Sequence, residues 1–430
     1  MSFGKRAINS KDGKILVGNF AWLSILQIAG YVFPIITLPY LADVIGVEGF
    51  GKIAFAYSVI LWMQTIADWG FDYTATRDVA KHRDDLEKVS AIFSNVLWSR
   101  CLLMLISFVI LVVLIYSIPQ FYEARDALFV TSLMLVGHVF YPEWFFQAME
   151  RMKYITILGV MARLLFTIAV FVFIHKPEDY VLQPLFTSLG AVVSGILSLY
   201  FILGRWGVKL KQPCCRPIIT TIKNSTDVFI NNLMPNLYNS FSVVLLGMYG
   251  NEYMNGIYDA GKKFPTTANR FIAVLSRTFY PYLSRNSSKH STFAKMYLAI
   301  AFFVSLVLFS LGKPLLLLFY NESFVEALPV FQLMCVSMFF LAMNSVYGTN
   351  YLLINHHDRL LRNITMAVSL FGFVIAFPLI KYFGYKGAAW TYTISTVLMG
   401  VLPMLFALKM KNDNKTYLNV KKMFSSKNRK

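Results

Sequence analysis

Twelve long apolar runs dominate the chain and restrict what it can fold into. They lie near residues 15–40, 49–70, 91–117, 127–148, 155–174, 181–204, 225–247, 255–284, 293–319, 325–354, 361–382 and 386–408. Most reach the roughly 20 residues that one helical crossing of a bilayer needs. With 57% hydrophobic and only 14% charged residues, the chain is too apolar for an ordinary soluble protein of this length. The sequence therefore predicts an all-α integral membrane protein with twelve transmembrane helices.

Two of the runs contain residues that apolar helices seldom carry. Pro142 and Glu143 interrupt the fourth run, and Pro265 together with several cations interrupts the eighth. Irregular backbone and charge at membrane depth are tolerated where they line a cavity. We therefore expect these two segments to serve function as well as to span the membrane.

Lysine and arginine are distributed unequally between alternate connections. With the N-terminus inside, the inner side collects Lys5, Arg6, Lys11, Lys14, Arg77, Lys81, Arg83, Lys88, Arg151, Lys153, Arg205, Lys209, Lys211, Arg216, Lys223, Arg285, Lys289, Lys295, Arg359, Arg362 and the tail from Lys409 to Lys430. The outer side holds only Arg125, Lys176, Lys313, Lys381 and Lys386. This division follows the positive-inside rule and predicts that both termini are cytoplasmic. The net charge of +18 thus indicates membrane orientation and not nucleic-acid binding.

Similar residues recur in the two halves of the chain. The segment Gly49–Gly51 precedes Gly256–Tyr258 by about 207 residues, and Gln147 and Arg151 precede Asn355 and Arg359 by 208. Six spans per half would give a parallel repeat about an axis along the membrane normal. We expect an N-terminal lobe at residues 1–204, a basic cytoplasmic linker at 205–224, a C-terminal lobe at 225–409 and a basic tail at 410–430.

The cations inside the runs are the candidate binding residues. Lys263, Arg270 and Arg277 are seven residues apart, so on a helix they form one stripe with steps of about 10 Å. Cations at membrane depth usually face a bundle interior or a watery cavity. We therefore predict a cavity for an anionic cargo, with lining residues from both halves of the chain. They are Arg100, Arg163, Lys262, Lys263, Arg270 and Arg277.

Each cation also has a structural interpretation. Asp68 could form a buried pair with Arg100 or Arg163, Asp259 could neutralise Lys263, and Arg277 could extend to the membrane surface. The carboxylates Asp68, Glu143 and Asp259 are therefore predicted to serve charge pairing or ion coupling. The sequence leaves the two roles open.

Catalytic and cofactor motifs are not recognisable in the sequence. His356, His357 and Asp358 read as a solvated turn and not as a metal site, and His138 reads as a hydrogen-bonded packing residue. Glycine-rich nucleotide motifs are missing, and the four cysteines have no metal-binding spacing. We expect no catalytic residues, no metal and no cofactor, hence a transporter and not an enzyme.

Three local patterns carry a resemblance to a known family. They are Pro34, Pro39–Ala42 and Gly46 to Gly51; Asp68–Phe71 with Arg77; and Pro142 through Trp144–Gln147 to Arg151. Together they resemble the first, second and fourth helices of the Wzx-type O-antigen and polysaccharide flippases, members of the multidrug/oligosaccharidyl-lipid/polysaccharide exporter superfamily. Asp43 and Ala148 depart from the pattern, because relatives often carry Arg and Gly there, so no cationic role is carried over to position 43.

The resemblance implies two six-helix lobes around a central cavity, in a multi-pass protein of the bacterial inner membrane. It implies a flippase for an undecaprenyl diphosphate-linked oligosaccharide of the lipopolysaccharide O-antigen type. The flippase would transfer this lipid from the cytoplasmic to the periplasmic leaflet by alternating access. Membrane lipids, a proton or sodium ion for coupling, and glycan-assembly proteins are the expected partners of a monomer. A multidrug or small-molecule antiporter of the same fold is the alternative, and a membrane glycan polymerase or acyltransferase is a weaker one.

Overall fold

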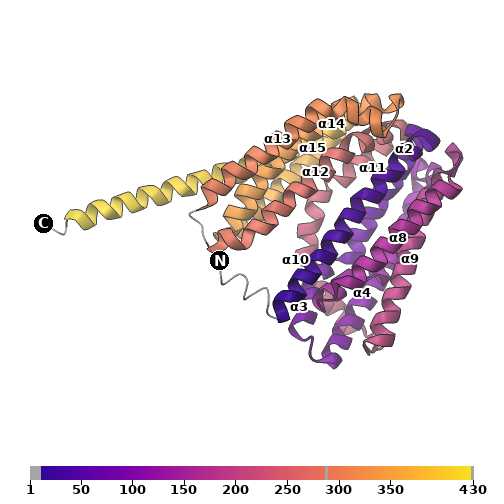
Figure 1. Ribbon diagram of the computed structural model, residues 1–430, viewed down its shortest axis with the longest axis horizontal. Helices are drawn as coiled ribbons and strands as arrows, with labels where there is room; N and C mark the ends of the chain where they lie inside the picture. Colours follow the sequence, from indigo (N-terminus) through magenta and orange to yellow (C-terminus); the bar gives the residue numbers. More distant parts are fainter. Residues whose placement is uncertain (1–10, 286–288, 428–430) are drawn as a thin grey trace. The chain divides into compact units, whose positions relative to one another are not determined.

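The computed structural model describes residues 11–285 and 289–427, and every regular element in them is a helix. The first part contains α2 (Lys11–Asp68), α3 (Phe71–Lys81), α4 (Leu86–Ser117), α5 (Pro119–Glu123), α6 (Arg125–Phe140), α7 (Glu143–Ala148), α8 (Met152–Phe173), η1 (Pro177–Val181), α9 (Leu182–Leu199) and η2 (Tyr200–Arg205). The second contains α10 (Cys215–Asn236), α11 (Ser240–Tyr249), α12 (Glu252–Arg285), α13 (His290–Phe319), η4 (Glu322–Ala327), α14 (Leu328–Met343), η5 (Asn344–Leu353) and α15 (Asp358–Lys427) (Figure 1). Lys5, Arg6 and the end of the basic tail at 428–430, used above for orientation, lie outside the described residues.

Eight helical segments in the described part are long and apolar enough to cross a membrane. They are Ala21–Lys81, Leu86–Ser117, Arg125–Ala148, Met152–Phe173, Pro177–Arg205, His290–Phe319, Glu322–Leu353 and Asp358–Met410. The predicted all-α membrane class is thereby confirmed. The count of twelve stays a prediction, since α10 and α12 fall below the apolar limit that the eight satisfy.

Two of the eight segments are broken by a glycine in a conformation that other residues avoid. Gly46 inside α2 has φ 61° and ψ −173°, and Gly384 inside α15 has φ 54° and ψ −132°. Both lie in regions of φ and ψ open essentially to glycine alone. Each of these long helices is therefore two helices joined at a sharp turn.

The expected interruptions by proline have different outcomes. The backbone breaks between α6 and α7, where Tyr141 and Pro142 are not helical. By contrast, α12 is helical through Pro265. A proline in a helix removes one hydrogen bond and often bends the axis without ending it. The fourth run is thus irregular as predicted, and the eighth is a continuous helix.

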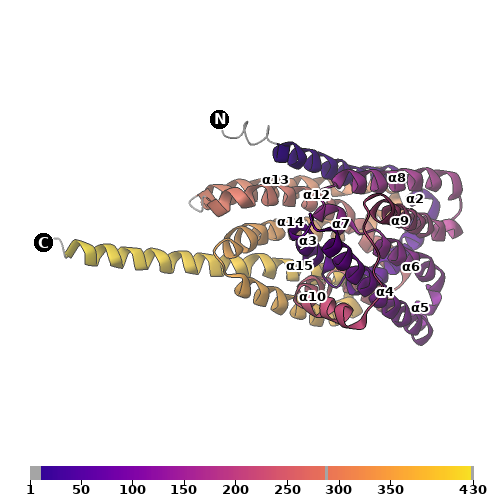
Figure 2. The ribbon, with the colours of Figure 1, turned by 90° about the horizontal axis from the view of Figure 1, so that it is seen from below.

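The chain packs as two compact units, each treated separately below. Unit 1 comprises Met1–Asn236, Gly250–Gly256 and Leu317–Ser323, and unit 2 comprises Leu237–Tyr249, Ile257–Leu316 and Phe324–Lys430. These packing units do not follow the predicted lobe boundaries, because α10 belongs to unit 1. Within unit 1, α2 and α8 run side by side, and α9 packs on α8 and α6 (Figure 1, Figure 2).

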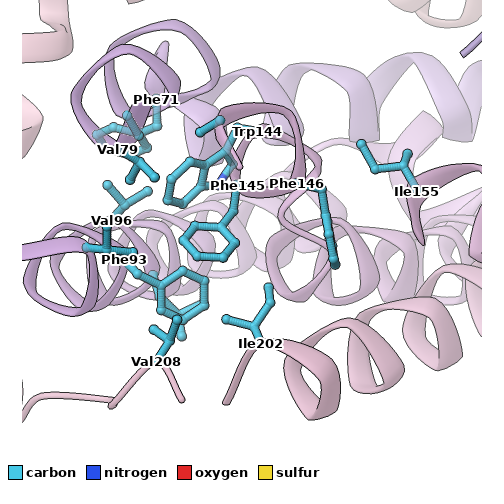
Figure 3. Packing of buried hydrophobic residues seen from close by; sticks show 14 of the residues in the cluster. Phe71, Val79, Phe93, Val96, Trp144, Phe145, Phe146, Ile155, Ile202 and Val208 are labelled. Carbon is cyan, nitrogen blue, oxygen red and sulfur yellow. The ribbon is translucent and has the colours of Figure 1, made fainter. Parts of the chain in front are cut away.

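A core rich in aromatic side chains surrounds α7 in unit 1. Trp144, Phe145 and Phe146 of α7 are 2% exposed or less. Trp144 and Phe145 lie beside Phe93 of α4, whereas Phe146 lies on the side of Ile155 and Ile202 (Figure 3). The ring of Phe145 meets that of Phe93 edge-on at 5.0 Å. Truncating a buried Phe or Trp to Ala typically costs about 3–5 kcal/mol. This core fixes the short helices α3 and α7, which carry several of the charged residues discussed below.

The connection after η2 is held along α4 by a row of hydrogen bonds. Ser90 Oγ accepts from Lys209 N at 3.0 Å, and Ser94 Oγ accepts from Lys211 N at 2.9 Å. Farther along the same helix, Trp98 Nε1 donates to Lys211 O at 2.9 Å. These residues are four apart, so they share one face of α4. The predicted linker is therefore docked in its first part, and its last part begins α10.

Two glycines allow α2 and α12 to cross at backbone contact within unit 1. A Cβ at Gly51 would lie 1.6 Å from Glu252 O, and one at Gly256 would lie 2.0 Å from Val47 O. Neither position has room for any side chain. Beside the crossing, Lys52 Nζ lies 3.4 Å from Glu252 Oε2. The glycines that suggested an internal repeat thus serve a direct packing role.

Unit 2 has its own core where α12, α13 and α14 meet. Ile272, Tyr297 and Met338 are buried there at 5% exposure or less. The hydroxyl of Tyr297 donates to Ile272 O at 3.1 Å. In addition, Asn350 Nδ2 of η5 donates to Ser276 Oγ of α12 at 2.7 Å. The helix that carries the cation stripe is therefore fixed on its buried face.

Candidate functional site

The first group of charged residues forms at the corner between α2 and α3. Asp68 ends α2, and the chain reverses through Trp69 at φ 42° and Gly70 at φ 79°. The strained Trp69 is held by stacking on Phe229, with ring centroids 3.9 Å apart, and by a 3.2 Å bond from its Nε1 to Thr226 Oγ1. The reversal places Asp72, in the first turn of α3, beside Asp68.

Arg100 of α4 bridges these two carboxylates. Its Nη2 lies 2.5 Å from Asp68 Oδ1 and 2.9 Å from Asp72 Oδ1. The Arg100 side chain is 2% exposed, whereas that of Asp72 is 48% exposed. A buried guanidinium needs such partners, because an unpaired charge in the interior is strongly unfavourable. The predicted pairing of Asp68 is thus observed with Arg100.

His138 of α6 completes this cluster. Its Nε2 lies 2.9 Å from both carboxylate oxygens of Asp68. The hydrogen-bonded role predicted for the imidazole is therefore confirmed, but its partner was not foreseen. Asp72 was missed altogether, although two carboxylates four residues apart at a helix end were a visible signal.

Arg163 of α8 lies apart from any close carboxylate in the part of the chain that the structure describes. Its Nη1 donates to Gly159 O of its own helix at 3.3 Å, and its guanidinium lies beside Gly30 of α2. The Arg163 side chain is partly exposed, and Glu143 is exposed at the start of α7. Neither residue has an ion pair among the described residues. Their predicted roles stay open.

The second group lies on α12 in unit 2. Asp259 Oδ1 and Lys262 Nζ are 3.3 Å apart, and Lys262 also lies over the ring of Tyr258 at 5.1 Å. Asp259, which we expected to neutralise Lys263, thus forms its ion pair with Lys262 instead. An i,i+3 pair on one helix face is favourable.

The stripe Lys263, Arg270 and Arg277 lies on the same helix. None of the three forms an ion pair with a described carboxylate, and Arg270 and Arg277 are exposed while Lys263 is half-buried. Three cations without a direct ion pair to a described carboxylate, at steps of about 10 Å along one helix, form a row that suits a polyanion. By contrast, the cluster around Arg100 already contains its own anions. The chemistry of the two groups therefore differs.

Comparison with known proteins supports a transport role. Residues 16–287 match the family described as "Polysaccharide biosynthesis protein". Proteins named "Putative O-antigen transporter" from Escherichia coli (strain K12) and Shigella dysenteriae are each 25% identical, over 90% and 91% of this chain and 95% and 98% of their own.

Solved transporters share the fold at low identity. The lipid II flippase MurJ in its inward closed conformation aligns with a TM-score of 0.72 and 14% identity, covering 91% of this chain and 87% of its own. The MATE multidrug transporter DinF-BH aligns at 0.58 and 16%, covering 92% and 94%.

The eight long apolar helices define a multi-pass membrane protein, and its fold is similar to that of solved transporters. The chain belongs to the polysaccharide biosynthesis protein family, whose model covers well over half of it. The resemblance found in the sequence is thereby confirmed.

Proposed function

We propose that the protein is a flippase for an undecaprenyl diphosphate-linked oligosaccharide of the O-antigen type. It would move this lipid from the cytoplasmic to the periplasmic leaflet of the bacterial inner membrane by alternating access. Family membership, the O-antigen transporter relatives and the likeness to a lipid II flippase support the proposal. The observation that carries it is the row of cations on α12 that form no ion pair with a described residue.

That row fits the cargo's chemistry. A diphosphate and its often acidic sugars need cationic counter-charges, and Arg offers bidentate contacts to phosphate. Lys263 and Arg270 are the principal candidates, with Arg163 as a candidate in the first half. Lys262 and Arg100 are already paired with carboxylates. We therefore assign those two a supporting role in holding the site's shape.

We further propose twelve spans in two six-helix lobes, with both termini cytoplasmic. The kinks at Gly46 and Gly384 divide two of the eight apolar segments, each long enough for two crossings. The pair α10 and α11 and the charged helix α12 would supply the remaining spans. Polar spans are tolerated where they face a water-filled path.

The membrane potential gives the direction of transport. The cytoplasm is electrically negative, so moving two negative charges outward is favoured by roughly 4–5 kcal/mol per 100 mV. Ion coupling through Asp68, Glu143 or Asp259 would add to this drive. A multidrug antiporter of the same fold is disfavoured, because its typical cationic drugs would meet the cations of α12.

The test replaces the stripe residues one at a time in cells that depend on this protein for surface glycan. Lys263→Ala and Arg270→Ala should abolish surface glycan while membrane levels stay normal. Arg270→Lys, which keeps the charge, should retain display, and Thr278→Ala on the same helix is a neutral control. Normal glycan in both alanine variants would refute the assignment of these cations.

A further inference from the structure

A small pocket lies in unit 2 where α13, η5 and α15 meet. Its volume is about 200 Å³, and its polar lining consists of His290, Ser291, Lys295, Tyr347 and Tyr351. Apolar side chains of α13 and α15 form the remaining wall, including Leu408, which is 43% exposed. A mostly apolar hollow with a few convergent polar groups is the usual form of a ligand site.

The irregular helix η5 shapes one wall. Asn344–Leu353 is a π-helix, and short π-helical turns are frequent at functional sites. The rings of Tyr347 and Tyr351 lie 5.9 Å and 5.0 Å from the imidazole of His290. His290 Nε2 donates to Val346 O at 3.0 Å, which fixes the ring against η5. The aromatic side of the pocket is therefore well defined.

The sequence places the pocket at the edge of the hydrocarbon region. Lys295 lies near the start of the apolar run at 293–319, and the run at 386–408 ends at Leu408, directly before Lys409. Tyrosine is enriched at this headgroup level, where its ring is in lipid and its hydroxyl is in water. The pocket thus lies at the depth where phospholipid phosphates are found.

The three segments that line the pocket carry charge of one sign. Residues 289–298, 344–353 and 401–410 contain no Asp or Glu, while Lys289, Lys295 and Lys409 are exposed. Lys295 forms no ion pair with a described residue. Basic pockets beside membrane helices attract anionic lipid headgroups, at about 1 kcal/mol per cation near the surface. An anion is therefore the expected occupant.

We propose that this pocket binds the headgroup phosphate of an anionic phospholipid. Lys295 supplies the counter-charge, Ser291 and the tyrosine hydroxyls donate to phosphate oxygens, and the lipid's glycerol and first acyl carbons lie against Leu408. The apolar wall favours a lipid over free phosphate, because free phosphate would leave that wall in water. The site is independent of the transported cargo.

The experiment is a lipid titration of the full-length protein in detergent, followed by native mass spectrometry. The probes are phosphatidylglycerol, zwitterionic phosphatidylcholine and inorganic phosphate. We expect one tightly retained phosphatidylglycerol per protein in preference to phosphatidylcholine. Lys295→Gln should weaken phosphatidylglycerol retention about fivefold, the equivalent of about 1 kcal/mol. The control is Lys313→Gln, an exposed lysine near the other end of α13, which should leave retention unchanged.

A second, milder variant separates loss of lipid binding from loss of folding. Tyr351→Phe removes only a hydroxyl and should also reduce retention, with the thermal midpoint in lipid-free detergent unchanged. Equal retention by Lys295→Gln and Lys313→Gln would overturn the proposal, as would equal binding of phosphatidylcholine. Displacement of phosphatidylglycerol by inorganic phosphate at equal concentration would show a soluble-anion site and overturn the lipid assignment.

Discussion

The Nη2 atom of Arg100 lies 2.5 Å from Asp68 Oδ1, with the guanidinium almost wholly enclosed by protein. Asp68 is held on its other side by His138, and Asp72 shares the same guanidinium. Four polar groups from four helices thus meet at one point inside unit 1. Removing Arg100 would leave the carboxylates of Asp68 and Asp72 without the cation that both contact.

Replacing Arg100 by Met should therefore destabilise the protein by about 3–5 kcal/mol, as expected when one member of a buried ion pair is lost. The triple variant R100M/D68N/D72N should recover much of this loss, since no isolated charge remains. Thermal unfolding of the detergent-purified proteins measures both effects. If R100M unfolds at the wild-type temperature, the bridge is not stabilising the corner.

A methyl group at the crossing of α2 and α12 should be poorly tolerated. Gly51→Ala and Gly256→Ala would each place a Cβ within 2.0 Å of a backbone oxygen, and overpacking of this kind costs about 1–3 kcal/mol or more. Gly18→Ala is the matched control in α2, because nothing lies within 4 Å of its Cβ. It should be neutral or stabilising by up to about 1 kcal/mol. Equal membrane yield and melting temperature for all three variants would contradict the crossing.

The serines of α4 should protect the docked linker from proteolysis. The double variant S90A/S94A removes the acceptors of Lys209 N and Lys211 N, each bond contributing about 0.5–1.5 kcal/mol. Trypsin should then cleave after Lys209 and Lys211 faster than in the wild type, in detergent-solubilised protein. Ser310→Ala, which removes only a bond within α13, should leave the rate unchanged. Unaltered cleavage in S90A/S94A would mean that other contacts hold the segment.

The start of α4 should weaken in acid. Asp85 caps this helix by accepting from Lys88 N at 3.1 Å, and this bond lowers the pKa of its carboxyl below the usual value. A carboxyl with a lowered pKa stabilises the folded state above its unfolded pKa of about 3.9 and loses that contribution as pH falls through the lower folded pKa. The protection factors of the amides in the first turn of α4, which compare each exchange rate with its intrinsic rate at the same pH, should therefore fall below about pH 4. Asp85→Ala should show fast exchange already at neutral pH, and Asp85→Asn should keep most of the protection.

The sequence predicts the local features of this protein better than its long-range contacts. Apolar runs specify helices directly, because a membrane helix satisfies its own backbone. The pair Asp68 and Arg100 was foreseeable, since few other charges share that depth. The docking of residues 208–211 on Ser90 and Ser94 was not foreseeable, because its partners are more than a hundred residues apart. Nothing in the pattern of Asn344–Leu353 signals a π-helix.

The membership of α10 in unit 1 has a practical meaning for dividing the chain. A cut within residues 205–224, where composition suggests a natural joint, would remove α10 from the Trp69 and Ser99 contacts it makes in unit 1. A cut at the turn between Asn236 and Ser240 would keep α10 with its partners in unit 1 and would separate only Gly250–Gly256 and Leu317–Ser323 from that unit. Complementation between two co-expressed fragments should therefore depend on the choice of breakpoint. The boundary between the packing units at Asn236 therefore lies one helix, α10, beyond the boundary that the composition of residues 205–224 suggests.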